Sequence, residues 1–409
     1  LGLIVKKEKI AANGDWNLSG ERYRESGVQS VRWPLVRISD ICEFRSGLWK
    51  GEKEPLRVVK ILRNTNFTKN GFLDLSNIAE HPVEIRHLES RLLQYGDILL
   101  EKSGGGPTQP VGRVALFNLH EGEYSFSNFT ARIRATDKRA DPIFVWLCLN
   151  HIYRTGATEA LQKQTSGIRN LDNPAYQAIK IPLPPLEVQR EIVAEIEGYQ
   201  KVIDGARMVV DNYRPHIPID PEWPMVRLEK LCVSIQNGFP VKQQDDGRYL
   251  VTRIQTIADG TIDLSKTKRT NDPVPEDRLM EHGDILFSHI NSIDHLGKTA
   301  IFRGAPVPVV HGINLIRLRP RTELVDSHFL LWSMKQDHFI ETAKSFAQRA
   351  VNQASIKVTD IREMEIPIPR LSIQQEIVAE IDTEQALVQA NRDLIARFEK
   401  KIASVLERV

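Results

Sequence analysis

The segment Glu191-Ile192-Val193-Ala194-Glu195-Ile196 recurs unchanged at Glu376–Ile381, 185 residues later. Trp33-Pro34-Leu35-Val36-Arg37-Ile38 recurs as Trp223-Pro224-Met225-Val226-Arg227-Leu228, 190 residues later and in the same order. Such a period is far longer than the few tens of residues of a solenoid repeat. The sequence therefore predicts two copies of a whole domain in one chain.

The bulk composition is that of an ordinary globular protein. The 409 residues are 41% hydrophobic and 26% charged, with a formal net charge of +2. No apolar run approaches the roughly 20 residues of a membrane span, so we expect no membrane contact. The three cysteines, Cys42, Cys148 and Cys232, are widely spaced and predict buried thiols in a reduced, cytoplasmic protein, with no metal site. A small net charge does not exclude nucleic-acid binding, because the local placement of cations matters.

Short β-prone runs broken by Gly, Asn and Pro fill each copy. Helices are expected at Pro142–Tyr153 in the first copy and Ser327–Gln336 in the second. This mixture predicts the α+β fold class, with two similar domains. The predicted organisation is an N-terminal extension (1–30), a first domain (31–181), a central helix (182–214), a second domain (215–366) and a C-terminal helix (367–409).

A proline-marked exit and a long helix follow each domain. Pro185 suits the first turn of a helix from Leu186 to Tyr213, and Ser372 with Gln375 fits a capping box. Apolar residues at alternating steps of three and four form a heptad seam, namely Ile192, Ile196, Tyr199 and Ile203, then Ile377, Ile381, Val388 and Ile395. The shared phase predicts that the two helices pair as an antiparallel coiled coil, which relates the domains by a pseudo-two-fold axis. The alternative is that each helix packs on its own domain.

Two motifs resemble catalytic sites, but neither is repeated. Asn173-Pro174-Ala175-Tyr176 approaches the Asn-Pro-Pro-Tyr/Phe motif of amino-methyltransferases, without a glycine-rich strand-turn-helix before it. Asp97, Glu101 and Lys102 have the composition of a metal-dependent nuclease site, without its spacing. We interpret the first motif as a turn, and Asp97 and its counterpart Asp284 as turn-stabilising carboxylates. No catalytic residue is predicted.

Between the repeated framework segments, the two copies differ in residues that can read bases. Arg, Lys, Gln and Asn pair with base edges and phosphates, and the alternative is that these are solvated surface loops. The candidate DNA-binding residues are Lys102, Ser103, Gly104, Gly105, Arg113, Lys163, Gln164 and Arg169 in the first copy, and Ser288, His289, Asn291, Lys298, Arg349, Gln353 and Lys357 in the second. Arg132 and Arg134 match Arg317 and Arg319 as shared cations for phosphate contacts, or as strand residues that face solvent.

The duplicated signature resembles the DNA-specificity subunit of type I restriction–modification systems over about residues 31–409. It consists of the Trp-Pro strand, Gly96-Asp97-Ile98-Leu99 followed by Ser-Gly-Gly, and the helix entry Pro184-Pro185-Leu186 with Gln189. The second copy departs from it, with Arg370 in place of the second proline and no Gly-Gly after Asp284.

The resemblance implies a non-catalytic protein with two target-recognition domains, each reading one half of a split site in double-stranded DNA. It further implies that the helices set the spacer and dock two N6-adenine methyltransferase subunits, which use S-adenosylmethionine, and that restriction subunits join them. This chain would hold no cofactor. Two alternatives remain: the specificity region of a fused N6-adenine methyltransferase/restriction enzyme, suggested by Asn17–Tyr23, and a scaffold that does not bind DNA.

Overall fold

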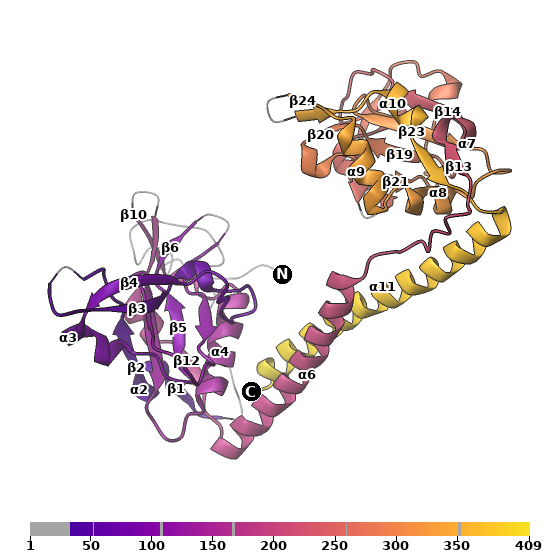
Figure 1. Cartoon of the computed structure of the whole chain (residues 1–409). Helices are drawn as coiled ribbons and strands as arrows, with labels where there is room; N and C mark the ends of the chain where they lie inside the picture. The colour runs from indigo at the N-terminus through magenta and orange to yellow at the C-terminus, as the bar shows by residue number, and fades with distance from the viewer. Residues whose placement is uncertain (1–32, 52, 107–108, 166–167, 259, 351–352) are drawn as a thin grey trace. The chain divides into compact units, whose positions relative to one another are not determined.

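The chain folds into two compact units. The computed structural model describes residues 33–409 apart from 52, 107–108, 166–167, 259 and 351–352 (Figure 1). Unit 1 comprises Leu1–Met208 and Arg392–Val409, and unit 2 comprises Val209–Asn391. The C-terminal end of the chain therefore belongs to the unit that contains the first domain.

Unit 1 is built on a four-stranded antiparallel sheet in the order β2-β9-β5-β7, with smaller sheets β4-β3-β8, β10-β11-β6 and β1-β12. Helix α4 packs its apolar side chains into the core of this unit. The elements are β1 (Leu35–Arg37), α2 (Ile38–Ile41), β2 (Cys42–Ser46), β3 (Leu56–Leu62), β4 (Ala79–Glu84), α3 (Ile85–Leu88), β5 (Ile98–Glu101), β6 (Ser103–Gly105), β7 (Val114–Leu116), β8 (Tyr124–Phe126), β9 (Thr130–Ala135), α4 (Pro142–Arg154), β10 (Gln162–Thr165), β11 (Ile168–Leu171), α5 (Asn173–Gln177), β12 (Lys180–Pro182) and α6 (Leu186–Asn212).

Unit 2 repeats this plan with a six-stranded sheet, β14-β23-β19-β21-β17-β16, and the sheets β18-β15-β22, β20-β25-β24 and β13-β26. Its elements are β13 (Met225–Arg227), α7 (Leu228–Leu231), β14 (Cys232–Asn237), β15 (Tyr249–Thr252), β16 (Ile257–Ala258), β17 (Gly260–Ile262), β18 (Lys268–Thr270), β19 (Ile285–Ser288), β20 (Ile290–Asn291), β21 (Thr299–Ile301), β22 (Val309–His311), β23 (Leu315–Pro320), α8 (Ser327–Ser333), α9 (Asp337–Ser345), β24 (Gln348–Ala350), β25 (Gln353–Ser355), α10 (Val358–Glu363), β26 (Glu365–Pro367) and α11 (Leu371–Glu407). The expected mixture of helix and sheet is confirmed in both units.

A buried glutamine fixes the start of each long helix in the same way. Gln189 accepts a hydrogen bond from the Asp141 backbone N–H (2.8 Å) and donates to the carbonyls of Arg139 (2.8 Å) and Pro184 (2.7 Å). Gln374 makes the three corresponding bonds, to Asp326 N–H (2.8 Å) and the carbonyls of Leu324 (3.2 Å) and Pro369 (2.9 Å). Both side chains are fully buried. The glutamine of the repeated helix entry therefore ties the helix to the loop that precedes α4 or α8.

The capping box expected at Ser372 and Gln375 is wrong, because α11 begins at Leu371 and places Ser372 inside the helix. The helix expected over Ser327–Gln336 ends at Ser333. Beyond this point the Gln336 side-chain amide donates to the carbonyls of Trp332 (3.1 Å) and Pro215 (3.2 Å). The expected helix at Pro142–Tyr153 and the burial of the three cysteines are confirmed.

Candidate DNA interface

Each domain brings some of its predicted base-reading residues together on a small three-stranded antiparallel sheet. In unit 1, β6 pairs with the hairpin β10-β11, and in unit 2, β20 pairs with the hairpin β24-β25 (Figure 1). These strands come from polar segments that lie about 60 residues apart in the sequence. We call them the first and second hairpin sheets.

The first hairpin sheet gathers Ser103, Gly104 and Gly105 on β6, Lys163 and Gln164 on β10, and Arg169 on β11. The Ser103 hydroxyl donates to Asn170 Oδ1 (2.6 Å), which ties β6 to the hairpin. The exposed Lys163 forms an ion pair with Asp172 (2.6 Å). Gly104 has a φ of +103°, a conformation that disfavours side chains. The side chain of Gln164 lies outside the part of the chain that the structure describes.

Two predicted cations of the first domain make internal contacts. Lys102 Nζ donates to the Ser46 hydroxyl (3.2 Å). Arg113 lies outside the hairpin sheet, where its Nε donates to Glu101 Oε2 (2.6 Å) and its other nitrogens donate to the carbonyls of Phe67 (3.3 Å) and Asn64 (3.1 Å). Burial raises the pKa of Glu101 more than Arg113 lowers it. These bonds favour a structural role for the Arg113 guanidinium over a phosphate contact.

The second hairpin sheet gathers Asn291, Arg349 and Gln353. Asn291 donates to the Ser288 hydroxyl (3.2 Å), and Gln353 is exposed. Lys357 follows β25 and is exposed, whereas the Arg349 side chain lies outside the described residues.

Ser288 and His289, both predicted from the sequence to contact DNA, are buried. The His289 ring nitrogens lie 3.1 Å and 3.2 Å from the carbonyls of Ile356 and Ile313. This geometry makes His289 a brace between the second hairpin sheet and the domain. Lys298 is exposed and makes no ion pair with any residue that the structure describes.

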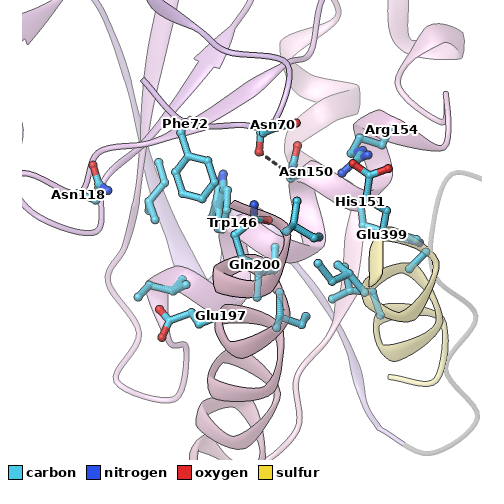
Figure 2. A pocket seen from close by; sticks show the side chains of 18 of the residues that line it. Asn70, Phe72, Asn118, Trp146, Asn150, His151, Arg154, Glu197, Gln200 and Glu399 are labelled. Carbon is cyan, nitrogen blue, oxygen red and sulfur yellow. Dashed lines mark hydrogen bonds between the residues drawn. The ribbon is translucent and has the colours of Figure 1, made fainter. Parts of the chain in front are cut away.

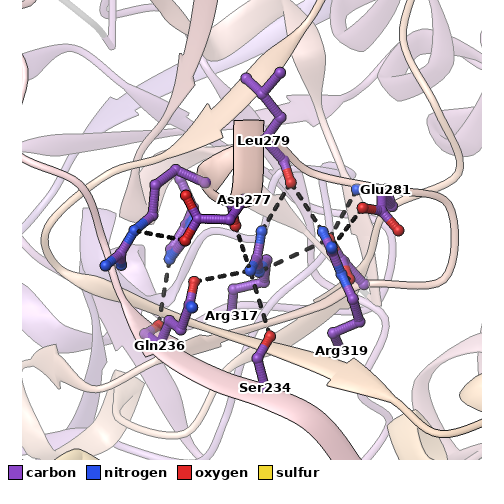
Figure 3. Close-up of polar contacts among 10 residues, drawn as sticks. Ser234, Gln236, Asp277, Leu279, Glu281, Arg317 and Arg319 are labelled. Atoms are coloured by element: carbon purple, nitrogen blue, oxygen red, sulfur yellow. Dashed lines mark hydrogen bonds and ion pairs between the residues drawn. The ribbon is translucent and has the colours of Figure 1, made fainter. Parts of the chain in front are cut away.

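The arginines shared by β9 and β23 stabilise the interior, and the expectation that they face solvent or phosphates is wrong. Arg317 is 1% exposed and donates to the carbonyls of Leu279 (2.7 Å) and Asp277 (2.9 Å) and to Gln236 Oε1 (2.8 Å) (Figure 3). Arg319 forms two hydrogen bonds of 2.9 Å with Asp284 and an ion pair with Glu281.

The first domain repeats this network. Arg134 binds Asp97 at 2.6 and 2.7 Å, and Arg132 is buried and donates to the Ser90 carbonyl (3.2 Å). The Asp97 carboxylate also accepts from the Gln94 N–H (2.7 Å), and Asp284 accepts from the Glu281 N–H (2.8 Å). The interpretation of both aspartates as turn-stabilising carboxylates is therefore confirmed. Sequence reasoning missed their arginine partners because strand pairing alone brings them together.

The methyltransferase-like motif forms the short helix α5, and not the expected turn. Its Tyr176 is 1% exposed in the core of unit 1, where burial raises the pKa of the phenol. A ring packed in this way cannot stack on a base.

The comparisons with known proteins agree with this duplicated plan. A family model described as the type I restriction modification DNA specificity domain matches residues 30–204 and again residues 221–399. The chain belongs to this family. The resemblance seen in the sequence is thereby confirmed.

Individual relatives cover different shares of this specificity protein. A Methanocaldococcus jannaschii protein provisionally named type I restriction enzyme MjaX specificity subunit is 40% identical over 164 residues, which are 39% of this chain and 38% of the relative. The type I restriction enzyme MjaVIII specificity subunit of the same organism is 22% identical, with 91% of this chain and 92% of the relative covered. A chain from a solved type I R-M system has a TM-score of 0.59 at 22% identity, covering 92% of this chain and 97% of that chain, and so shares the fold.

The predicted seam residues of this specificity protein are all buried or half-buried. Within unit 1, α6 contacts the end of α11. The Tyr199 and Phe398 rings lie 5.3 Å apart, and Arg207 pairs with Glu399 (2.8 Å). Within unit 2, the Tyr213 hydroxyl donates to Glu384 (2.7 Å). Ile377 and Ile381 pack in the core of unit 2, which is the behaviour expected if each helix packs on its own domain.

A cavity of about 380 Å³ lies in unit 1 where α4, α6 and the end of α11 meet (Figure 2). Its lining includes Phe72 and Trp146, and the two predicted seam residues Ile196 and Ile203. The helices therefore do not close completely around their apolar seam.

Among the described residues, no group of three or more His, Cys, Asp or Glu side chains could hold a metal ion. No helix in this part of the chain is both long and apolar enough to cross a membrane.

Proposed function

We propose that this specificity protein reads a bipartite site in double-stranded DNA, with one half-site for each domain. The observation that carries the proposal is the pair of hairpin sheets, each assembled from polar segments distant in sequence. Lys163 is exposed and Arg169 is half-buried on the first sheet, while Gln353 and Lys357 are exposed at the second. These side chains provide donors for base edges and phosphates. A two-stranded β-ribbon fits the major groove of B-DNA.

The long helices are proposed to set the spacer between the half-sites as an antiparallel coiled coil. The contacts between Tyr199 and Phe398 and between Arg207 and Glu399 support this within unit 1. The contact between Tyr213 and Glu384 supports it within unit 2. A helix of 27 residues such as α6 is about 40 Å long. A change in its length would therefore change the distance between the two half-sites.

The same helices are proposed to dock two N6-adenine methyltransferase subunits, which bind S-adenosylmethionine, with restriction subunits as further partners. The cavity between α4, α6 and the end of α11 supports docking, because a hollow lined by both apolar and polar side chains can accept a side chain from a partner. The names of the relatives support a subunit role, since they are specificity subunits of type I restriction enzymes.

Methylome sequencing of cells that carry the intact system, followed by a domain exchange, tests the proposal. Replacing residues 33–181 with those of another family member is expected to change one half-site and leave the other intact. A change in both half-sites, or in neither, would contradict the assignment of one domain to one half-site.

A second variant, in which α6 is lengthened by one heptad after Ile196, tests the role of the helices. A whole heptad keeps the apolar seam in phase, so the spacer is expected to change while both half-sites persist. A spacer of unchanged length would contradict the proposal that the helices set the distance between the half-sites.

A further inference from the structure

We propose that the first domain holds one unstacked nucleobase in a pocket beside β6, with Trp49 and Phe129 as stacking surfaces. This inference rests on the proposed function, because the base belongs to the DNA that the first hairpin sheet reads. The pocket has a volume of about 470 Å³, and its apolar floor includes Leu48, Ile61 and Val83.

The two aromatic side chains at the pocket are unusually exposed for their type. Trp49 is 75% exposed and Phe129 is 44% exposed, although both line the same cavity. Exposed aromatic rings beside cationic groups are the combination with which proteins stack single bases. A planar base between such rings would remove this apolar surface from water.

The charge at the pocket matches a polyanion. Lys50 and Arg63 line it, and no described residue of the lining carries a carboxylate. Lys102 lies on the adjoining segment between β5 and β6. An acidic peptide would match these cations equally well. Its carboxylates would not stack on the two exposed aromatic rings, whereas a planar base would, so the lining favours nucleic acid.

The pocket is joined directly to the first hairpin sheet. Asn64, one of its lining residues, donates from Nδ2 to the Ser103 carbonyl on β6 (2.7 Å). A Cβ added to Gly104 would meet Asn64 Nδ2 at 3.2 Å and Phe129 Cδ1 at 3.8 Å. DNA bound along this sheet would therefore bring a base within reach of the pocket.

The second domain has different residues at these places. The Leu48 N–H donates to Phe126 O (2.8 Å), and the Phe239 N–H donates correspondingly to His311 O (3.1 Å). This match places Pro240 at the position of Trp49 and Asn314 at the position of Phe129. The second domain therefore has no aromatic ring at either of these two positions, and Asn314 provides a matched control.

The test uses the complex of the full chain with its methyltransferase subunits and duplexes that carry the motif found by methylome sequencing. Each nucleotide of the motif is replaced in turn by an abasic site, and affinity is measured for the wild type, Trp49→Ala, Phe129→Ala and Asn314→Ala. Loss of stacking on one base is expected to weaken binding about tenfold. Trp49→Leu separates ring stacking from apolar volume, and Trp49→Phe is expected to restore most of the affinity.

The expected result is one position in the half-site of the first domain where the abasic change and Trp49→Ala are not additive. A mismatch at that position is expected to tighten binding by the wild type, because less unpairing energy is required. Additive effects at every position, with specific binding retained, would overturn the pocket and leave the proposed function standing. Loss of methyltransferase assembly in Trp49→Ala without any coupling to DNA would also overturn it. Failure of the wild type to bind its motif would contradict the proposed function itself.

Discussion

The two domains build the same turn after their Gly-Asp-Ile-Leu strands but give it different electrostatics. In the first domain, the Glu101 N–H donates to Arg113 O (2.8 Å) and the Gly112 N–H donates to Glu101 O (2.9 Å). In the second, the bonds from Ser288 to Lys298 (2.8 Å) and from Gly297 to Ser288 (2.9 Å) repeat this geometry. The Glu101 carboxylate neutralises Arg113, whereas Ser288 leaves Lys298 without a counter-ion from this turn.

The difference shows how a duplicated framework can carry different side chains. Strand pairing uses backbone groups that every residue except proline supplies, so the turn tolerates exchange of the side chains. The buried network of arginine and aspartate below it is kept in both copies. The backbone pairing and this network are therefore shared, while side chains around the turn differ between the copies.

The largest expected difference concerns the stability of this turn. Arg113→Ala would leave the Glu101 carboxylate buried without its cation, and loss of one partner of a buried pair costs about 3–5 kcal/mol. Lys298→Ala at the exposed counterpart should cost less than about 0.5 kcal/mol. Urea unfolding, with hydrogen exchange used to follow each domain separately, measures the loss of unfolding free energy in both variants. Similar losses of stability for Arg113→Ala and Lys298→Ala would show that the ion pair with Glu101 does not stabilise the first domain.

A second expected difference appears at acidic pH. His311 on β22 is fully buried where the first domain has Phe126, and burial, followed by the charge of Arg317, lowers the pKa of His311 to about 4 from its usual 6.5. Between about pH 6.5 and 4, His311 therefore binds a proton in the unfolded chain but stays neutral in the folded domain. Stability of the second domain should therefore fall as pH drops from about 6.5 to 4, by up to about 3 kcal/mol.

The variant His311→Phe should remove this loss and make the two domains alike in their pH response. Urea unfolding of the second domain between pH 4 and 7 measures the slope. The reverse change, Phe126→His, is the matched control and should introduce the same slope into the first domain. A slope that persists in His311→Phe would assign the acid sensitivity to another group.

The smallest expected effect is on DNA binding by the exposed cation. Lys298→Gln should lower the slope of log affinity against log salt by about one, because one phosphate contact releases about one counter-ion. Lys266→Gln is the control, since Lys266 already pairs with Asp263 (3.1 Å). Fluorescence anisotropy at several salt concentrations measures both variants. An equal effect of the two changes would mean that Lys298 does not contact phosphate.

Much of the fold could be predicted from local sequence. The prolines before Leu186 mark the start of α6, and the apolar run from Pro142 marks α4, because helix initiation and periodic burial depend on neighbouring residues. The strand pairs of the hairpin sheets were not predictable in this way. Asn170 meets Ser103 across 67 residues, and no local signal reports such a contact.

The candidate site was predictable only as a set of polar loops. Lys163 and Arg169 do lie on one hairpin sheet, but His289 turned out to be a buried brace and Arg113 an internal ion pair. Trp49 and Phe129 gave no signal in the sequence, because a single exposed aromatic residue looks the same as a core residue until its neighbours are known.

The sequence by itself determined that one chain holds two equivalent domains with two long helices, because repeats and helix starts are written in residue order. Tertiary structure alone decided which cations are free to act. An arginine is neutralised or available according to the carboxylates and carbonyls around it, and these come from strands that are far apart in the chain. Arg134 and Arg319 have aspartate partners 37 and 35 residues away in the sequence, whereas the Lys298 side chain is exposed to solvent.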